Sequence, residues 1–210
     1  MTLCNSLGNC PEKSNSKQDD ILCAAISEFA KFGVLGSTME HIAKRAQVSK
    51  RTLYKNYANK DELFDAVIDL QLGTISRLTE CPYQMDIPMH EQLRKLAYQA
   101  IKLTNNEDYL TLSRIVIIES MRSKEAADKV NSKFKDCEKG MSGWFSTAER
   151  AGALEGIPAK TAATMFYGSL KQLVYWERAI KWQPERTEEE LSVMVEQVCS
   201  VFAKGFSSTN

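Results

Sequence analysis

The amino-acid sequence predicts an all-α protein. Nine stretches of the chain are predicted to be helical, and in most of them apolar residues recur every three or four positions, which is the spacing of one face of an α-helix. Three of these stretches start with a Ser, Thr or Asn that is followed three residues later by Glu, a pattern that caps helix N-termini. No alternation of apolar and polar residues is long enough to predict a strand.

The composition is that of a globular chain: 210 residues, of which 43% are hydrophobic and 26% charged. The longest strictly aliphatic stretch, Ile115 to Ile118, is far shorter than the ~18 apolar residues of a membrane helix. The first 15 residues lack a basic patch followed by an apolar core, so we expect no signal peptide and a cytoplasmic protein. The six cysteines have no C-x-x-C pair and no zinc-ligand spacing with a His, so we expect no metal and no cofactor.

Charge is distributed unevenly along a chain that is neutral as a whole. The sequence has 27 Lys and Arg and 27 Asp and Glu, which argues against a general polyanion binder. Residues 1–60, however, hold nine basic and five acidic residues, a net charge of +4, and the other 150 residues have a net charge of −4. A basic first quarter and an acidic remainder indicate two different roles within one chain.

The first predicted helix follows a polar segment. Residues 1–16 include Gly8, Pro11 and several Asn and Ser, and we expect them to form a flexible arm. From Lys17 to Phe32 the apolar residues fall on one helical stripe, and Gly33 stands where a helix would end in a left-handed residue. A loop is predicted from Val34 to Gly36.

The second predicted helix is short. Ser37 and Glu40 form an S-x-x-E capping box, in which the Ser37 hydroxyl accepts from the backbone near Glu40 and the Glu40 carboxylate reaches back. Ile42 and Ala43 are expected to point inward. The helix is expected to end near position 46 or 47.

The third predicted helix runs from Ser49 to Asn56 and is mostly polar. Leu53 is its one clearly apolar inward side chain. Because a helix this short is marginal by itself in water, Leu53 and Val48 must hold it against its neighbours. Its outer face is then free for a partner and offers the side chains of Lys50, Arg51, Thr52, Tyr54 and Lys55.

Six further helices are predicted after the third. Asn59 and Glu62 cap a long helix that extends to about Thr79, and Pro82 and Pro88 bracket a linker. The following helices are expected at residues 89–105, 107–122, 124–151, 158–182 and 187–206. A T-x-x-E capping box starts the last of them.

Several short motifs stand in order between Lys17 and Leu63. They are Phe29 and Gly33, Ser37-Thr38, Ile42-Ala43, Val48-Ser49, Thr52-Leu53-Tyr54, Tyr57 and Lys60-Asp61-Glu62-Leu63. In this order and spacing they resemble the DNA-binding helix-turn-helix of the TetR family of bacterial transcriptional regulators. Met39 departs from the pattern, because some members have a base-reading Arg there, and base reading must then depend more on the second helix of the motif.

The resemblance implies an all-α architecture of about nine helices. An N-terminal three-helix helix-turn-helix domain, residues 17–63, is joined through a long helix to a larger helical core. Residues 64–210 are expected to form the ligand-binding and dimerisation domain. The family also implies a homodimer.

A helix-turn-helix inserts its second helix into the major groove of DNA while the first helix crosses the backbone. Hydroxyl and backbone N–H groups at a helix start suit phosphate, and an Arg suits a guanine edge. A solvated basic face without a partner is the alternative for such a cluster. The expected DNA-binding residues are Ser37, Thr38, Lys50, Arg51, Thr52, Tyr54, Lys55 and Lys60.

The last two predicted helices are expected to form the dimer interface. Each is apolar on more than one stripe, and a helix too apolar for one buried face is usually packed on two sides. We expect a four-helix interface built from two chains, and a monomeric core is the alternative. The expected interface residues are Phe166, Leu170, Leu173, Leu191, Val195, Val198 and Phe202.

The resemblance also implies a ligand pocket between the middle helices, which are rich in aromatic residues. Aromatic walls with a few polar tips suit a small hydrophobic or aromatic effector, although any one aromatic residue can instead belong to the core. Glu119 is either a buried counter-charge for a cationic ligand or, at the surface, the partner of Arg122 three residues on. The expected pocket residues are Tyr98, Glu119, Trp144, Phe166, Tyr167 and Trp176.

The expected function is that of a homodimeric repressor that binds a palindromic double-stranded DNA operator and is released by a small effector. A ligand-independent regulator that acts through dimerisation or a protein partner is the alternative. A helical enzyme on this fold is a third possibility. The sequence has no G-x-S-x-G, H-E-x-x-H or P-loop motif, so we expect no enzyme activity, and no membrane partner is expected either.

Overall fold

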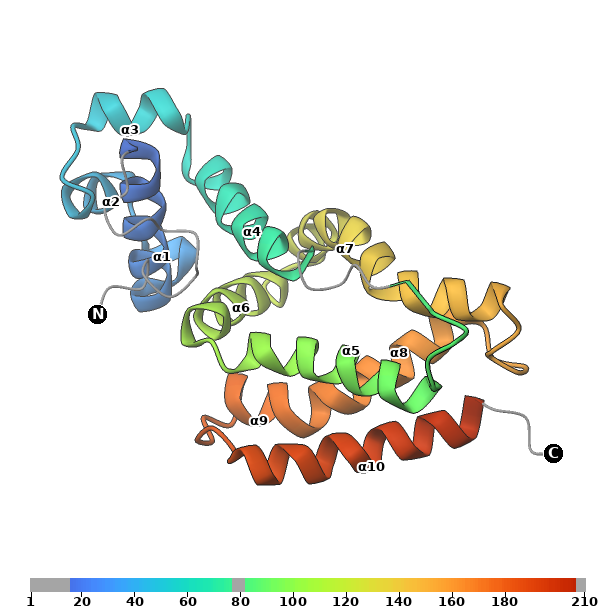
Figure 1. The fold of residues 1–210 in the computed structure, drawn as a ribbon. Coiled ribbons are helices and arrows are strands. Elements are labelled where there is room, and N and C mark those ends of the chain that lie inside the picture. The colour runs from blue at the N-terminus through green and yellow to red at the C-terminus, as the bar shows by residue number, and fades with distance from the viewer. Residues whose placement is uncertain (1–15, 77–81, 207–210) are drawn as a thin grey trace. The chain divides into compact units, whose positions relative to one another are not determined.

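The computed structural model describes the backbone of residues 16–76 and 82–206, and all side chains in these ranges except those of 74, 76 and 136–141. Within these ranges the chain forms α-helices and one π-helical segment, with no strand, which confirms the all-α prediction (Figure 1). No helix of this described part is long and apolar enough to cross a membrane. The arm expected at residues 1–16 lies outside the described residues except for Ser16.

The helices follow the predicted order closely. Their bounds are α1 (Lys17–Gly36), α2 (Met39–Arg45), α3 (Lys50–Asn56), α4 (Lys60–Ser76), α5 (Met89–Thr104), α6 (Glu107–Ser120), α7 (Lys124–Arg150), α8 (Ala159–Leu170), α9 (Trp176–Ala179) and α10 (Glu188–Phe206). The π-helical segment η1 (Lys171–Tyr175) connects α8 to α9. The single helix predicted at 158–182 is therefore three consecutive segments, because the hydrogen-bond register widens in its middle.

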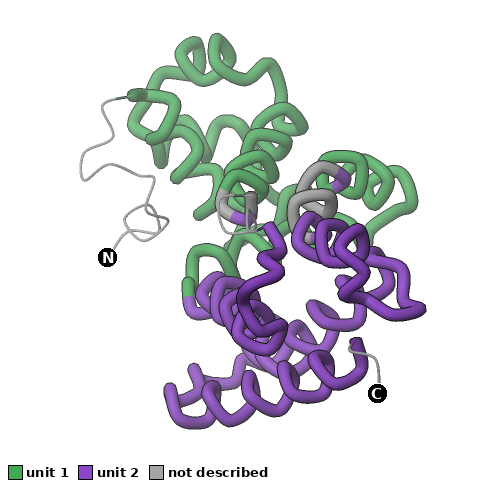
Figure 2. The backbone as a smooth tube through the Cα atoms, turned by 45° about the vertical axis from the view of Figure 1, so that its right-hand side comes forward, with its two compact units in different colours: residues 1–74, 106–134 green, residues 75–105, 135–210 purple. Residues whose placement is uncertain are grey.

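The chain divides into two compact units (Figure 2). The N-terminal unit contains residues 1–74 and 106–134, and the C-terminal unit contains residues 75–105 and 135–210. Helix α7 contributes its first part to one unit and its second part to the other. Each unit has its own cluster of buried apolar side chains.

The N-terminal unit is built around α1. Helix α1 packs against α2 and α6. Its Phe29 ring meets the Phe64 ring of α4 edge to face, with 6.1 Å between the ring centroids. A buried hydrogen bond of 2.7 Å from Gln71 of α4 to the hydroxyl of Ser113 joins α4 to α6. Helices α1, α2 and α3 thus share one core with α4 and α6.

Gly33 kinks α1 three residues before its end. Its φ of 69° is positive, as predicted, but its ψ of 166° is extended and not that of a left-handed helix. The loop predicted for Val34 to Gly36 is wrong, because these residues are helical up to Gly36. The backbone N–H and the hydroxyl of Ser37 both donate to the Gly33 carbonyl, at 3.2 and 2.7 Å, and close the last turn.

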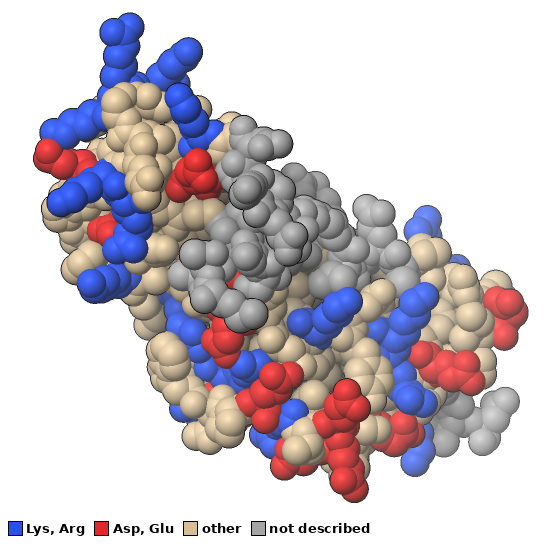
Figure 3. All heavy atoms as spheres, turned by 60° about the vertical axis from the view of Figure 1, so that its left-hand side comes forward, with Lys and Arg blue, Asp and Glu red and all other residues tan. Residues whose placement is uncertain are grey.

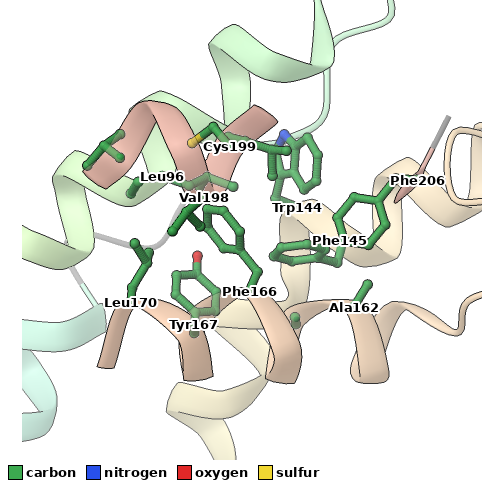
Figure 4. Close-up of a cluster of buried hydrophobic side chains, with 14 of the residues drawn as sticks. Leu96, Trp144, Phe145, Ala162, Phe166, Tyr167, Leu170, Val198, Cys199 and Phe206 are labelled. Carbon is green, nitrogen blue, oxygen red and sulfur yellow. The ribbon is translucent and has the colours of Figure 1, made fainter. Parts of the chain in front are cut away.

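The C-terminal unit packs α5, α8 and α10 around an aromatic cluster (Figure 4). The ring of Phe145 lies at the centre of this cluster, with centroid distances of 4.9 Å to Trp144, 5.8 Å to Phe166 and 6.2 Å to Phe206. These four side chains are at most 2% exposed. Burying large rings in this geometry is a strong source of stability for a domain of this size.

The capping box predicted for the last helix is confirmed. The Thr187 hydroxyl accepts from the backbone N–H of Glu190 at 3.2 Å, and the Glu190 carboxylate accepts from the Thr187 N–H at 2.9 Å. The start of α4 is capped in a similar way. The Asn59 side chain accepts from the Glu62 N–H at 2.8 Å, and the Glu62 carboxylate accepts from the N–H of Ala58.

Candidate nucleic-acid interface

The start of α2 differs by one residue from the predicted capping box. Thr38 is the N-cap, and its hydroxyl accepts from the backbone N–H of His41 at 3.2 Å. Ser37 is 2% exposed, and its hydroxyl donates to the Gly33 carbonyl. The predicted Ser37 cap is therefore wrong, and a buried Ser37 side chain is not available to a phosphate. Thr38 is exposed beside it.

Helix α3 has the predicted extent and orientation. Its N-cap Ser49 accepts from the backbone N–H of Thr52 at 3.0 Å, and Leu53 is its single buried residue, at 0% exposure. Lys50, Arg51, Tyr54 and Lys55 are exposed, with Tyr54 at 52%, and Thr52 is half-buried. Three cations of this helix are therefore exposed, and two of them, Arg51 and Lys55, lie on the face opposite Leu53.

A tight turn fixes the orientation of α3 relative to α2. Gln47 has a positive φ of 55°, and the Val48 N–H donates to the Ala43 carbonyl at 3.0 Å. Few non-glycine residues adopt this left-handed conformation, which turns the chain two residues after the end of α2. The two helices are thereby held in a helix-turn-helix arrangement.

Basic side chains surround this motif on the outside. Lys and Arg side chains project from the upper end of the N-terminal unit in Figure 3, where α3 lies. The exposed cations of α2 and α3 are Lys44, Arg45, Lys50, Arg51 and Lys55. The Lys50 ammonium pairs with the Glu40 carboxylate, and this hydrogen bond and charge lower the pKa of Glu40. The surface is therefore positive with one acidic group built into it.

Lys60, predicted to contact phosphate, also supports the motif from α4. Its ammonium donates to the backbone carbonyls of Leu35 at 2.9 Å and Ser37 at 2.8 Å. These carbonyls lie at and just after the end of α1, where a cation suits the helix dipole. Lys60 thus holds the corner between α1 and α2.

The pair between Arg45 and Glu28 was not predicted. The Arg45 Nε lies 2.7 Å from Oε1 of Glu28, which is a buried residue of α1. A signal existed in the sequence: Glu28 stands on the apolar stripe of the first helix, one residue before Phe29, where an acid needs a partner. No nearby residue pattern in the sequence indicated which Lys or Arg would be the partner of Glu28.

The structure does not assemble the six predicted ligand residues into one pocket. Phe166 and Tyr167 are buried in the aromatic cluster, and Trp144 is 1% exposed with its indole N–H donating to Gln92 at 3.0 Å. Tyr98 is 40% exposed. Packing rings against each other fills the space that a ligand would need, so the core alternative describes Phe166 and Tyr167 better.

The other two predicted ligand residues also have partners within the chain. Glu119 pairs with Arg122 at 3.0 Å, as the alternative prediction had it, but Glu119 is buried and not at the surface as that prediction expected. The Trp176 ring contacts the Tyr175 ring, with 4.9 Å between centroids. Glu119 belongs to the N-terminal unit, whereas Trp176 belongs to the C-terminal unit.

The C-terminal unit has an open pocket beside Trp144. It has a volume of about 390 Å³ and lies between the segment that precedes α5 and the first turns of α5. Its walls are Pro82, Gln84, Ile87, Glu91, Gln92, Lys95, Leu96 and Trp144. Of the predicted ligand residues, Trp144 lies in this wall.

Most residues predicted for the dimer interface are instead buried within the chain's own core. Phe166, Leu170, Leu191, Val195 and Val198 are at most 8% exposed, and Phe202 packs against the same core. They contact the interior because α8 and α10 pack on α5 and on each other. Leu173 is 37% exposed and remains available.

The geometry of the N-terminal unit is that of a helix-turn-helix protein. A family model described as "Bacterial regulatory proteins, tetR family" matches residues 21–67. A second model, described as "AefR-like transcriptional repressor, C-terminal domain", matches residues 91–207, which is more than half of the chain. The chain therefore belongs to the TetR family, whose members are non-enzymatic DNA-binding transcriptional regulators.

Individual relatives agree with this assignment. The chain is 32% identical over 82 residues to the uncharacterized HTH-type transcriptional regulator YhgD of Bacillus subtilis, covering 39% of this chain and 43% of YhgD. It is 36% identical over 62 residues to the HTH-type transcriptional repressor SCO4008 of Streptomyces coelicolor, covering 30% of this chain and 31% of that protein. The matched part thus spans less than half the length of these curated relatives.

A solved structure extends the likeness to the whole fold. The crystal structure of a TetR family transcriptional regulator from Pseudomonas syringae pv. tomato is 28% identical to this chain, with a TM-score of 0.80. The alignment covers 92% of this chain and 98% of that one. The C-terminal unit is therefore similar in fold to a TetR-family structure as well.

Proposed function

We propose that the chain is a sequence-specific DNA-binding repressor that acts as a homodimer and is released from its operator by a small effector. The observation that carries the DNA-binding part is helix α3, which buries Leu53 alone and turns Lys50, Arg51 and Lys55 outward. Such a helix gains its stability from the rest of the unit and leaves its polar face for a partner. Family membership supports DNA as that partner.

The proposed contacts divide into two kinds. Arg51, in the first turn of α3, is assigned to a base edge in the major groove, where Arg on guanine is the commonest specific contact. Thr38, Tyr54 and Lys55 are assigned to backbone phosphates, which position the protein without reading sequence. Further proposed contacts are Lys50, Thr52 and Lys60.

We propose a dimer face different from the one that the sequence pattern predicted. Helix α10 exposes Val193 and Val201, at 53 and 68%, on the side away from its buried stripe. Met165 of α8 and Leu173 of η1 are exposed at 51 and 37%. Exposed apolar side chains on two packed helices can form part of an interaction surface, and a twofold dimer presents two copies of α3 to two half-sites.

The effector part of the proposal is supported by the pocket beside Trp144. An open pocket of about 390 Å³, lined by four apolar and four polar or charged residues, can take a small hydrophobic or aromatic compound that carries polar groups. Compounds of this class, added to a preformed protein–DNA complex, are expected to release the DNA. If an extensive panel releases none, the ligand-independent alternative is favoured.

Selection of bound sequences from random double-stranded DNA tests the central part of the proposal. The expected result is a palindromic consensus with two half-sites about one helical turn apart or a multiple of it. Enrichment of no sequence at low ionic strength would contradict it. Sedimentation of the free protein at micromolar concentration tests the dimer separately.

A further inference from the structure

An ion pair joins the two helices of the motif across the turn between them. The Glu40 carboxylate, in the first turn of α2, holds the ammonium of Lys50, which is the first residue of α3. The Glu40 and Lys50 side chains are 65 and 61% exposed, so both groups can be reached from solvent. The cation proposed for DNA therefore already has an anionic partner in the chain.

We propose that Glu40 restrains DNA binding by competing with the phosphate backbone for Lys50. The inference deepens the proposed function and rests on it. A carboxylate and a phosphate oxygen are alternative acceptors for the same ammonium group. In this competition Lys50 leaves Glu40 when it contacts a duplex, and Glu40 then remains unpaired beside a polyanion.

The restraint on DNA binding does not depend on the sequence of the DNA. Phosphate contacts supply essentially all of the free energy of non-specific binding. Opening one exposed ion pair lowers affinity by the same factor for an operator and for any other duplex. The protein thus binds bulk DNA less tightly, while base reading by Arg51 is untouched.

This competition is expected to change the salt dependence of DNA binding. Each phosphate neutralised by a protein cation releases counterions and makes the slope of log K against log salt concentration more negative by about 0.9. In the wild type the freed Glu40 carboxylate attracts a cation as Lys50 transfers to phosphate, which offsets part of that release. Removing the carboxylate removes the offset.

The test uses the full-length protein, a labelled operator duplex from the selection experiment, and a labelled duplex that lacks the operator. Glu40→Gln is expected to tighten binding to both duplexes by about two- to five-fold, the range of an exposed ion pair, and to steepen the salt slope by up to about 0.9. Asp61→Asn is the matched control, because it removes one exposed acidic charge from the first turn of α4 in the same unit. It is expected to change affinity less.

A double-mutant cycle separates the pair from a general field effect. In a Lys50→Gln background, Glu40→Gln is expected to gain less affinity than in the wild type, because only the direct repulsion between Glu40 and the DNA is then removed. An equal gain in that background, an equal gain from Asp61→Asn, a gain on the operator alone, or no gain at all would overturn the inference and leave DNA binding by α3 intact. A wild type that binds no duplex at low salt would overturn the proposed function and the inference together.

Discussion

The Nε of Arg45, in the last turn of α2, lies 2.7 Å from a carboxylate oxygen of Glu28 on α1. The Arg45 side chain is 44% exposed, whereas the Glu28 side chain is 5% exposed. The second carboxylate oxygen of Glu28 has no hydrogen-bond partner among the described residues. Arg45 thus compensates a buried acid and at the same time fixes α2 against α1.

Replacing Arg45 by Ala is expected to lower the free energy of unfolding by about 1–3 kcal/mol, because it leaves a buried carboxylate unpaired. Urea unfolding followed by circular dichroism measures this. Lys44→Ala, on the neighbouring exposed position of the same helix, is the control and is expected to change stability by less than about 0.5 kcal/mol. Equal effects of the two substitutions would show that the pair does not stabilise the motif.

Lys60→Met is expected to loosen the corner between α1 and α2. It keeps most of the apolar stem but removes the donor to the Leu35 and Ser37 carbonyls, at a cost of about 1 kcal/mol for a partly exposed site. Amide hydrogen exchange at Ser37 and its neighbours should become faster, while exchange in α10 stays unchanged. Unchanged exchange at this corner would contradict the supporting role assigned to Lys60.

The proposed dimer face gives a separate prediction. Val201→Lys is expected to convert the dimer into a monomer in sedimentation velocity, without loss of helix content, because Val201 is 68% exposed in the single chain. Ser192→Lys, on the opposite side of α10 by helical geometry, should leave the dimer intact. A dimer that survives Val201→Lys, or that Ser192→Lys also breaks, would exclude this face.

Cys199 is expected to resist alkylation in the folded protein. Burial, helped by the charge of Glu196, raises the pKa of the Cys199 thiol to about 11. At pH 8 the thiolate fraction is then about 100-fold lower than at the ordinary pKa of 9.0. Mass spectrometry after iodoacetamide treatment should find Cys199 unmodified until the protein is denatured. Rapid modification at pH 8 in the native state would contradict its burial.

The same pKa shift predicts a loss of stability at high pH. The thiol is neutral below pH 9.0 in both states, so its contribution to folding is complete there. As pH rises from about 9 to 11 the unfolded chain ionises first, and stability falls. In Cys199→Ala this part of the pH dependence should be absent, and an unchanged curve would assign it to other groups.

Most of the helices could be predicted because their signals are local. The caps at Asn59 and Thr187 and the stripe of α1 each lie within a few residues of the helix they define. The Ser37 cap was wrong because two hydroxyl residues stand side by side: the first donates to the Gly33 carbonyl four residues earlier, and Thr38 is the cap. The π-helical segment has no sequence signal of comparable strength.

The candidate sites show where pattern alone is insufficient. Periodicity identifies an apolar stripe but not whether its partner is the same chain or a second copy, so core residues such as Phe166 and Val195 were assigned to the dimer. Aromatic content likewise cannot separate a filled core from a pocket. The outward face of α3 was predictable because a single apolar residue, Leu53, determines which side is buried.

The most direct test of the account compares wild type and Arg51→Ala on the selected operator and on an unrelated duplex at one salt concentration. Loss of a bidentate base contact is worth about 1–3 kcal/mol, so operator affinity should fall by about 5- to 150-fold. Affinity for the unrelated duplex should change little, whereas Lys55→Ala should weaken both alike. Unchanged operator affinity in Arg51→Ala would contradict the claim that α3 reads DNA.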